Sequence, residues 1–398
     1  MQQNSPFFRE DPEKYWDFSL LKNAPSFRDG PEESRATGLR SLLVSGFGPA
    51  AGSELPEPPP EHLSKKVKAE FFAYLGFPET PVPEGGFPGV VMIHGGGGTA
   101  FPSAAQYWIK HGYAVIALDW YNQYPVPYPE FDVEVRSPFE VTEEELPKIL
   151  TFDKKPLPGG KRQDHVANVA NVILAHSLLL AQPDVNPEKT AFVGLSWGSW
   201  YGAMVAAVDP RFRGGVEIYC GDIKKESDAF TNGRFHHAAK VPLYWITGTD
   251  DQHITLQGMK NAFEECPKVS NHTFVIQLSH SHEGYYLNAC MRMADHFTQS
   301  KPGLPKLSEI TANGNTVSAE ILAPGNGIQW AELCYTEDTD PVPCKREWKH
   351  IPAKIEKNTI SAELPAGAHQ YFISAYEGKS NKNDLCGSTV PVILPIPE

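Results

Sequence analysis

A serine between two glycines is the first feature of the sequence that could do chemistry. Residues 192–201 read F-V-G-L-S-W-G-S-W-Y, with Ser196 between Gly194 and Gly198. This G-x-S-x-G pattern is typical of a strained turn between a strand and a helix, which presents a serine hydroxyl for nucleophilic attack. The pattern is short, and an ordinary turn beside a core helix can also carry it. Its meaning therefore depends on what the rest of the chain supplies.

A run of four glycines lies upstream of this serine. The segment H-G-G-G-G at 94–98 follows the apolar run G-V-V-M-I. Glycine leaves backbone N–H groups free to point at an anion, so we predict an oxyanion hole formed by Gly95, Gly96 and Gly97 with the backbone N–H of Trp197. A flexible loop or a phosphate cradle are the alternatives. The segment lacks the G-K-[S/T] ending of a phosphate-binding loop, and it stands where esterases carry their oxyanion loop.

A nucleophilic serine also needs a carboxylate that orients its base. In folds with this kind of elbow the chain order is Ser, then Asp or Glu, then His. The segment T-G-T-D-D-Q-H-I offers Asp250 and Asp251 after an apolar run. We favour Asp251, because its spacing from Gly248 carries it clear of the strand end, and Asp250 is the alternative acid. Asp222 in Y-C-G-D is a weaker rival, and any of these aspartates could be an ordinary turn or N-cap residue.

The base is expected in S-H-S-H-E-G-Y-Y, after the last apolar run of this region. The segment contains His280 and His282. Alternation in an extended chain places their imidazoles on opposite sides, so only one can serve. We favour His280, the first histidine beyond the run, and His282 is the alternative base. With Ser196 and Asp251 this predicts a serine hydrolase, which needs no cofactor because triad, oxyanion hole and water suffice.

Aromatic side chains are predicted to line the substrate site. Phe101, Trp120 and Tyr121 stand at or just after predicted strand ends. Aromatic faces suit the apolar faces of sugar rings. We therefore expect these three residues to bind a small-molecule or oligosaccharide ester, from which the protein removes an acetyl or another small acyl group.

Short apolar runs alternating with helical stretches must position these residues. The runs are V-K-A-E-F-F-A-Y-L, G-V-V-M-I-H, Y-A-V-I-A-L-D, K-T-A-F-V-G, G-G-V-E-I-Y-C, V-P-L-Y-W-I-T-G and T-F-V-I-Q-L. The clearest helical stretch is 164–181, where apolar residues recur at helical spacing. Continuous apolar runs separated by helices predict the α/β class with a mostly parallel central sheet, whose carboxyl strand ends carry the chemistry.

The chain divides into three predicted regions. Residues 1–66, rich in proline and charge, are expected to form an irregular arm with one short helix around 13–21. Residues 67–301 form the predicted catalytic domain, in which 122–160 is a lid-like insertion. Residues 302–398 carry short alternating strands broken by Asn-Gly, Pro-Gly and Ala-Gly turns, which predict an antiparallel β-sandwich of the Ig or fibronectin type.

Composition excludes several classes of protein. The formal net charge of −13 over 398 residues argues against nucleic-acid binding. No run approaches about 18 apolar residues, so no membrane partner is expected. Six cysteines are too few for a disulfide scaffold, although Cys334 and Cys344 could bridge, and no zinc motif predicts a metal. The first ten residues do not resemble a signal peptide, which leaves a cytoplasmic protein or a mature secreted or periplasmic form.

Several motifs together resemble a known group. They are H-G-G-G-G-T-A-F, G-Y-A-V-I-A-L-D, V-I-L-A-H-S-L-L, G-L-S-W-G-S-W, G-T-D-D and S-H-S-H, and the resemblance covers roughly residues 67–297. Over this range the chain is similar to α/β-hydrolases of the acetyl xylan esterase-like and dienelactone hydrolase-like group. The resemblance implies the α/β-hydrolase fold. It places the nucleophile on Ser196, the acid on Asp251, the base on His280 and the oxyanion loop on 95–97.

The chain departs from this group in two places. Ser199 and Trp200 follow Gly198 where the group usually has small residues, and the insertion 122–160 has no counterpart that we can match. Dienelactone-type hydrolysis normally uses cysteine at the elbow, where this chain has Ser196. A peptidase of the prolyl-oligopeptidase type and a non-catalytic binding protein on a hydrolase scaffold are the competing functions.

Overall fold

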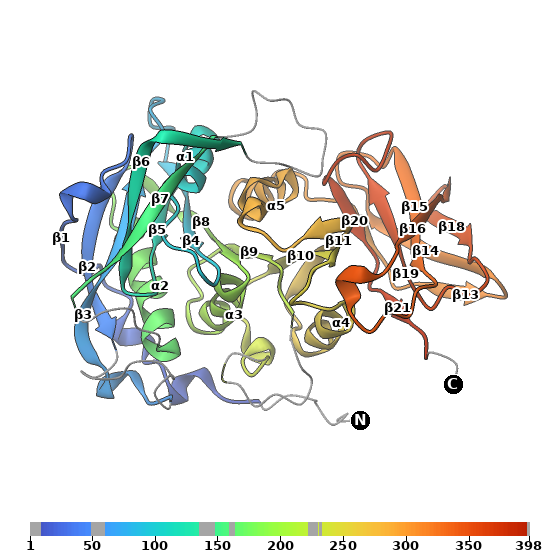
Figure 1. The fold of residues 1–398 in the computed structure, drawn as a ribbon, viewed down its shortest axis with the longest axis horizontal. Helices are drawn as coiled ribbons and strands as arrows, with labels where there is room; N and C mark the ends of the chain where they lie inside the picture. Colours follow the sequence, from blue (N-terminus) through green and yellow to red (C-terminus); the bar gives the residue numbers. More distant parts are fainter. Residues whose placement is uncertain are drawn as a thin grey trace.

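The structure is a computed structural model that describes residues 9–48, 60–134, 148–158, 164–221, 230 and 233–395. The described residues form a large mixed sheet with helices on both faces, followed by a C-terminal part built of antiparallel sheets (Figure 1). This arrangement confirms the predicted class, an α/β-hydrolase fold with an added all-β part. Among the described residues, no helix is long and apolar enough to cross a membrane.

The central sheet has nine described strands, and its parallel portion carries the predicted site. Pairing is antiparallel from β1 through β2 and β3 to β5, and parallel across β5, β4, β8, β9, β10 and β11. In sheet order the strands are β1 Phe27–Asp29, β2 Arg40–Gly48, β3 Val67–Gly76, β5 Ala114–Leu118, β4 Phe87–Ile93, β8 Val185–Leu195, β9 Gly214–Ile218, β10 Leu243–Asp250 and β11 Val269–Ser279.

Helices cover both faces of the sheet, and each face has its own apolar core. The buried side chains of α2, α3 and α4 pack mainly into one core, and those of α1 and α5 into the other (Figure 1). The described α-helices are α1 Pro102–Lys110, α2 His165–Leu180, α3 Trp197–Val208, α4 Leu256–Glu265 and α5 Asn288–Gln299. Strands covered on both faces need apolar residues at every position, which explains why β5 and β10 read as continuous apolar runs.

The predicted helix at 164–181 is α2, and its start has a clear physical cause. Asp164 adopts an extended conformation before the helix, and its side chain accepts a hydrogen bond from the Ala167 N–H (3.0 Å). This bond satisfies one of the four N–H groups that a helix leaves unpaired at its N-terminus.

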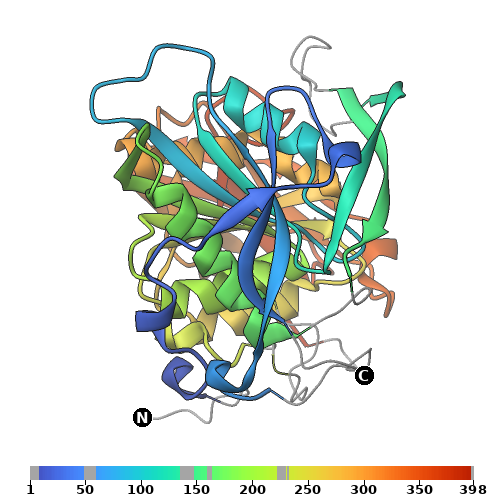
Figure 2. The same cartoon turned by 90° about the vertical axis from the view of Figure 1, so that its left-hand side faces the viewer.

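The N-terminal arm is more regular than predicted. The expectation of an irregular segment over 1–66 is wrong for β1 and β2, which extend the central sheet beyond β3 (Figure 2). The expected helix at 13–21 consists of two 3₁₀ turns, η1 Pro12–Lys14 and η2 Phe18–Leu20. The prediction treated the whole segment as one region rich in proline and charge, but these residues lie mainly outside β2. There Leu42, Leu43 and Val44 are buried against β3.

The predicted insertion at 122–160 contains a two-stranded antiparallel hairpin. Its strands are β6 Gln123–Glu134 and β7 Lys148–Pro156. Figure 2 shows the hairpin, coloured green, beside the central sheet. Residues 135–147 and 159–160 of the insertion lie outside the described residues. A lid function stays a prediction.

The C-terminal part consists of two antiparallel sheets packed around a third apolar core. One contains β12 Lys306–Leu307, β14 Thr316–Ala323, β18 Thr359–Glu363 and β17 Lys354–Glu356, with β13 Thr311–Asn313 alongside; the other contains β16 Lys349–Pro352, β15 Trp330–Thr336, β19 Gln370–Tyr376 and β20 Cys386–Ser388, with β21 Val392–Ile393 alongside. This part is joined to the α/β part by a hydrogen bond from Thr273 Oγ1 to the Cys386 carbonyl (2.6 Å). Cys334 and Cys344 are free thiols, so the possible bridge between them is absent.

The remaining short 3₁₀ turns connect these elements. They are η3 Glu32–Ser34, η4 Leu63–Lys65, η5 His236–Ala238, η6 His282–Tyr286 and η7 Pro343–Lys345.

Candidate active site

Ser196 occupies a strained turn between β8 and α3. It is the first residue after β8, and its backbone has φ 56° and ψ −117°. A non-glycine residue with positive φ is uncommon, and such strain is held only where the surroundings determine it. The Ser196 N–H donates to the Ile218 carbonyl at the end of β9 (2.8 Å). The elbow is thus fixed to the neighbouring strand, and the side chain stays partly exposed.

The two glycines of the elbow are required by close backbone contacts. A Cβ at Gly194 would lie 2.3 Å from the Gly198 carbonyl oxygen, and a Cβ at Gly198 would lie 2.0 Å from the Ile93 carbonyl oxygen. No side chain fits at such distances. The G-x-S-x-G spacing therefore lets the backbone of β8, the start of α3 and the end of β4 approach one another around the serine.

The glycine loop between β4 and α1 lies against this elbow. A Cβ at Gly95 would be 3.2 Å from the Ser196 Cβ, and a Cβ at Gly96 would be 2.7 Å from Trp197 Cδ1. Trp197 is the first residue of α3, whose first N–H groups have no partner within the helix. The glycine loop thus packs against Ser196 and Trp197, and an oxyanion hole formed by its N–H groups stays a prediction. Gly97 lies farther along the loop and adopts φ 72°.

Asp251 and His280 form a close pair at the ends of β10 and β11, which β9 separates from the serine strand β8. Each is the first residue after its strand, β10 and β11, so both lie at the carboxyl edge that Ser196 occupies. His280 Nδ1 is 2.8 Å from Asp251 Oδ2, and the Asp251 side chain is fully buried. Asp251 Oδ1 accepts the N–H groups of His253 and Ile254, each at 2.8 Å. A carboxylate held in this way keeps the Nδ1–H tautomer and leaves the His280 Nε2 atom free to accept a proton.

The alternative acid and base are placed differently. Asp250 accepts a hydrogen bond from Thr249 Oγ1 (3.2 Å), and burial raises the pKa of its carboxyl. His282 Nε2 is buried without a hydrogen-bond partner among the described residues, and burial lowers the pKa of this imidazole to about 4. Asp222 lies outside the described residues. The geometry therefore joins Asp251 to His280 and leaves both alternatives apart from that pair.

Tyr219 is a site residue that sequence reasoning missed. It is the first residue after β9 and has φ 57°. Its ring stacks on His280 with centroids 4.4 Å apart, and its hydroxyl donates to the Ser279 carbonyl (2.9 Å). The Tyr219 ring therefore supports one face of the imidazole. The sequence offered one signal for this role, an aromatic residue near the end of the apolar run G-G-V-E-I-Y-C.

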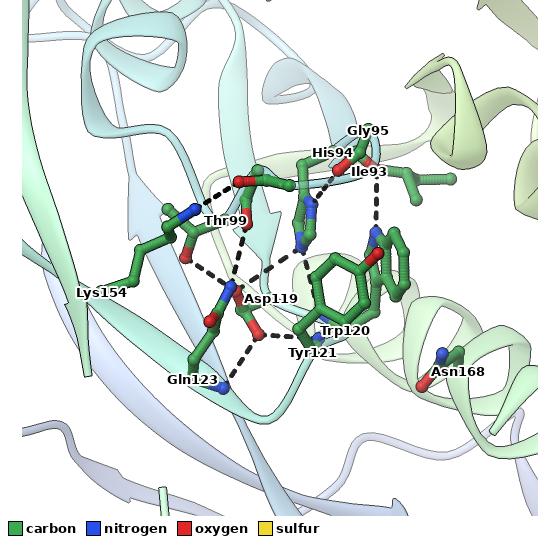
Figure 3. Close-up of polar contacts among 12 residues, drawn as sticks. Ile93, His94, Gly95, Thr99, Asp119, Trp120, Tyr121, Gln123, Lys154 and Asn168 are labelled. Carbon is green, nitrogen blue, oxygen red and sulfur yellow. Dashed lines mark hydrogen bonds and ion pairs between the residues drawn. The ribbon is translucent and has the colours of Figure 1, made fainter. Parts of the chain in front are cut away.

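The three residues predicted to bind substrate differ in exposure. Trp120 is 2% exposed and its indole Nε1 donates to the His94 carbonyl (2.8 Å), while its ring stacks on the His94 ring. Tyr121 is buried beside it, as Figure 3 shows. Phe101 is partly exposed and its ring centroid lies 4.7 Å from that of His282. Trp120 and Tyr121 thus support the glycine loop from within, and substrate contact by the three residues stays a prediction.

The tryptophans around the elbow have packing partners of their own. The Trp197 ring stacks on the His165 ring with centroids 5.6 Å apart. Trp200 is buried, and its Nε1 donates to the Gly221 carbonyl (2.9 Å). The unusual Trp200 therefore braces α3 against the end of β9.

A buried carboxyl group behind the glycine loop was also missed. Asp119 is the first residue after β5, and it accepts hydrogen bonds from Thr99 Oγ1 (2.7 Å) and from the N–H groups of Tyr121 (2.8 Å) and Gln123 (3.0 Å) (Figure 3). Complete burial raises the pKa of Asp119 to about 7. The A-L-D ending of the apolar run was a signal for a strand-end carboxylate, although its role required the fold. Among the described residues, no cluster of histidine, cysteine and carboxylate side chains could hold a metal ion.

Comparison with known proteins identifies a family. The sequence profile of the dienelactone hydrolase family matches residues 71–282, which is more than half of the chain. This range contains the glycine loop, the elbow serine and the Asp251–His280 pair. No curated protein matches the chain significantly.

Solved structures with the same kind of fold are only distantly similar. An acetyl xylan esterase from Paenibacillus sp. R4 is 12% identical, with 70% of this chain and 92% of that chain covered and a TM-score of 0.45. Acetyl xylan esterase 1 from Thermoanaerobacterium sp. JW/SL YS485 is 12% identical, with coverage of 74% and 95% and a TM-score of 0.43. A puromycin-hydrolysing peptidase from Mycobacterium tuberculosis is 15% identical, with coverage of 65% and 46% and a TM-score of 0.42. Structural similarities this distant do not identify a substrate.

Proposed function

Since the chain belongs to the dienelactone hydrolase family of α/β-hydrolases, we propose that it is a serine esterase that cleaves carboxylic esters through an acyl-enzyme on Ser196. The observation that carries the proposal is the His280–Asp251 pair, 2.8 Å apart, at the same sheet edge as the strained Ser196 elbow. A nucleophile, a base and an orienting carboxylate are the three groups that acyl transfer by a serine requires.

The proposed reaction has two halves. Ser196 Oγ attacks the ester carbonyl carbon while His280 Nε2 takes the hydroxyl proton, which gives a tetrahedral intermediate. This intermediate collapses when the carbon–oxygen bond to the alcohol breaks, and the imidazolium returns its proton to the leaving oxygen. Water then attacks the acyl-enzyme in the same way. It releases the carboxylic acid and regenerates the serine.

The oxyanion and the imidazolium are the two charges that the site must stabilise. In the proposal the N–H groups of Gly96 and Trp197 donate to the oxyanion, since Gly96 packs on Trp197, which directly follows Ser196 at the start of α3. The ionised Asp251 carboxylate stabilises the imidazolium of His280 through their short hydrogen bond.

For the substrate, we propose acetyl or similarly small acyl esters of carbohydrates. Phe101 is partly exposed at the start of α1, beside the glycine loop. The apolar face of a sugar ring can pack against an aromatic ring of this kind. The proposed substrate is therefore a short acyl group on an oligosaccharide alcohol. The proposal about the substrate can fail without affecting the proposal about the hydrolytic chemistry.

The proposal is tested with two substrates and two serine variants. We expect the wild type to release p-nitrophenol from p-nitrophenyl acetate and Ser196→Ala to lose this activity by about 10⁴-fold or more. Ser308→Ala, in the C-terminal part, is the matched control and should keep it. Acetate release from acetylated xylo-oligosaccharides then tests the carbohydrate alcohol. A folded wild type inactive on both substrates, or a Ser196→Ala variant as active as the wild type, would contradict the proposal.

A further inference from the structure

Side chains outside the proposed triad hold the carbonyl groups of the glycine loop. Three of the four glycine carbonyls accept a hydrogen bond from such a side chain (Figure 3). The donors are His94 Nδ1 to the Gly95 oxygen (2.8 Å), Lys154 Nζ to the Gly97 oxygen, and Gln123 Nε2 to the Gly98 oxygen (2.9 Å). The loop is thus fixed through its acceptors, while Gly96 packs against Trp197 of the elbow.

Holding a carbonyl also fixes the direction of an N–H group. A trans peptide is planar, and its C=O and N–H bonds point in opposite directions. The Gly95 carbonyl therefore determines where the Gly96 N–H points. The Gly98 N–H in turn donates to the Gly95 carbonyl (3.1 Å), and its own direction is set by the Gly97 carbonyl. Fixing the Gly97 carbonyl thus also fixes the Gly98 N–H, and the hydrogen bond from this N–H to the Gly95 carbonyl helps to orient the Gly96 N–H, the proposed oxyanion donor.

Side-chain packing does little to restrain Gly97. Its φ of 72° lies in the region that only glycine adopts easily, and a Cβ placed there would meet no atom within 4 Å. Among the described residues, the peptide that joins Gly97 to Gly98 is held by two hydrogen bonds, from Lys154 Nζ to its carbonyl and from its N–H to the Gly95 carbonyl. A hydrogen bond from an ammonium group is about twice as strong as a neutral one.

Lys154 comes from the β6–β7 hairpin, and that hairpin is itself anchored. Tyr124 of β6 and Lys155 of β7 both donate to the Glu33 carboxylate in η3, which belongs to the N-terminal arm. Lys154 reaches the glycine loop, since its Nζ atom donates to the Gly97 carbonyl. Its stem is exposed, so removing the ammonium group leaves the core intact.

We propose that Lys154 is a positioning residue of the oxyanion loop: it holds the Gly97 carbonyl and thereby the N–H direction on which oxyanion stabilisation depends. This inference rests on the proposed esterase function. It gives the hairpin a role in catalysis that needs no closing movement. It also explains why a surface lysine ends on a backbone carbonyl although the protein carries an excess of carboxylates.

The test compares three lysine variants on p-nitrophenyl acetate. Lys154→Met keeps the length of the side chain without its charge, Lys154→Arg restores a donor, and Lys65→Met is an exposed control away from the loop. Loss of a direct oxyanion donor costs 10²–10³-fold in kcat, so loosening the loop should cost less, about tenfold for Lys154→Met, with KM changed less than about twofold. Lys154→Arg should recover to within about threefold, and Lys65→Met should match the wild type.

Two further readouts separate positioning from general stability. Inactivation of Ser196 by a p-nitrophenyl phosphonate builds a tetrahedral adduct, so its rate should fall in parallel with kcat while the Tm stays unchanged. Hydrogen exchange of the peptide covering residues 94–101 should become faster in Lys154→Met. Unchanged kcat with unchanged exchange, or an equal loss in Lys65→Met, would overturn the role of Lys154. If Ser196→Ala leaves hydrolysis intact, the esterase proposal fails, and the exchange measurement still decides whether Lys154 holds the loop.

Discussion

Replacing Asp251 by asparagine is expected to stop catalysis without unfolding the protein. Asp251 Oδ1 accepts two backbone N–H groups, from His253 and Ile254, and only an oxygen can accept them. The asparagine oxygen therefore keeps that place, and its NH₂ group takes the place of Oδ2, 2.8 Å from His280 Nδ1. An NH₂ group can only donate, so Nδ1 must become the acceptor and the ring proton moves to Nε2. That nitrogen then cannot accept the proton of Ser196.

The size of the loss follows from this change of tautomer. In serine hydrolases, the wrong tautomer lowers kcat by about 10⁴-fold while the geometry stays intact. At about 1.4 kcal/mol per factor of ten, this corresponds to about 5 kcal/mol of transition-state stabilisation. Because the backbone hydrogen bonds of the loop survive, we expect the Tm of Asp251→Asn to stay close to that of the wild type.

The assay is steady-state hydrolysis of p-nitrophenyl acetate, with Asp250→Asn as the matched control. The two aspartates are neighbours in sequence, but only Asp251 pairs with His280. Asp250→Asn should retain kcat to within about threefold, since a partly exposed carboxylate away from the imidazole contributes little. An Asp251→Asn variant within tenfold of wild-type kcat, or an equal loss in Asp250→Asn, would refute the assignment of the acid.

Further predictions concern the base, the elbow and a buried acid. His280→Ala should lower kcat by at least about 10³-fold, whereas His282→Gln should change it by less than about tenfold; the reverse result in the same ester assay would make His282 the base. Gly198→Ala should destabilise the protein by about 2 kcal/mol or more, because its Cβ would lie 2.0 Å from the Ile93 carbonyl oxygen, and an unchanged Tm would contradict this. Burial raises the pKa of Glu217 to about 7, from 4.5 in the unfolded chain. The folded state then binds the extra proton, so the free energy of unfolding should fall between pH 5 and pH 8, by at most about 3 kcal/mol from this group. Urea titrations should show a smaller fall for Glu217→Gln, and an equal fall would contradict the prediction.

The features that could be predicted from the sequence depend on local patterns. The runs that became β4, β5 and β10 are apolar throughout because helices cover both faces, and that pattern is visible without the fold. The elbow can be predicted from Gly194 and Gly198, because a close backbone contact excludes a side chain at each of these two positions. The strand-end rule then located Ser196, Asp251 and His280, each of which directly follows its strand.

Features set by long-range packing could not be predicted. β2 and β3 pair across residues 49–66, and nothing in R-S-L-L-V-S-G-F-G identifies β3 as the partner of β2. The contacts of Tyr219 with His280 and of Lys154 with Gly97 depend on strand order and on the placement of the hairpin. Trp120 followed a strand end as expected, yet its side chain turned inward, which spacing alone does not reveal.

Direct detection of the acyl-enzyme tests the central claim most directly. The protein would be mixed with p-nitrophenyl acetate, quenched in acid within the first turnover, digested and analysed by mass spectrometry. The account predicts one acetyl group on the peptide that contains Ser196, with its level raised in a variant that deacylates slowly and absent from Ser196→Ala. Hydrolysis that proceeds with no acetyl group on Ser196, or with the acetyl group on another residue required for turnover, would contradict it.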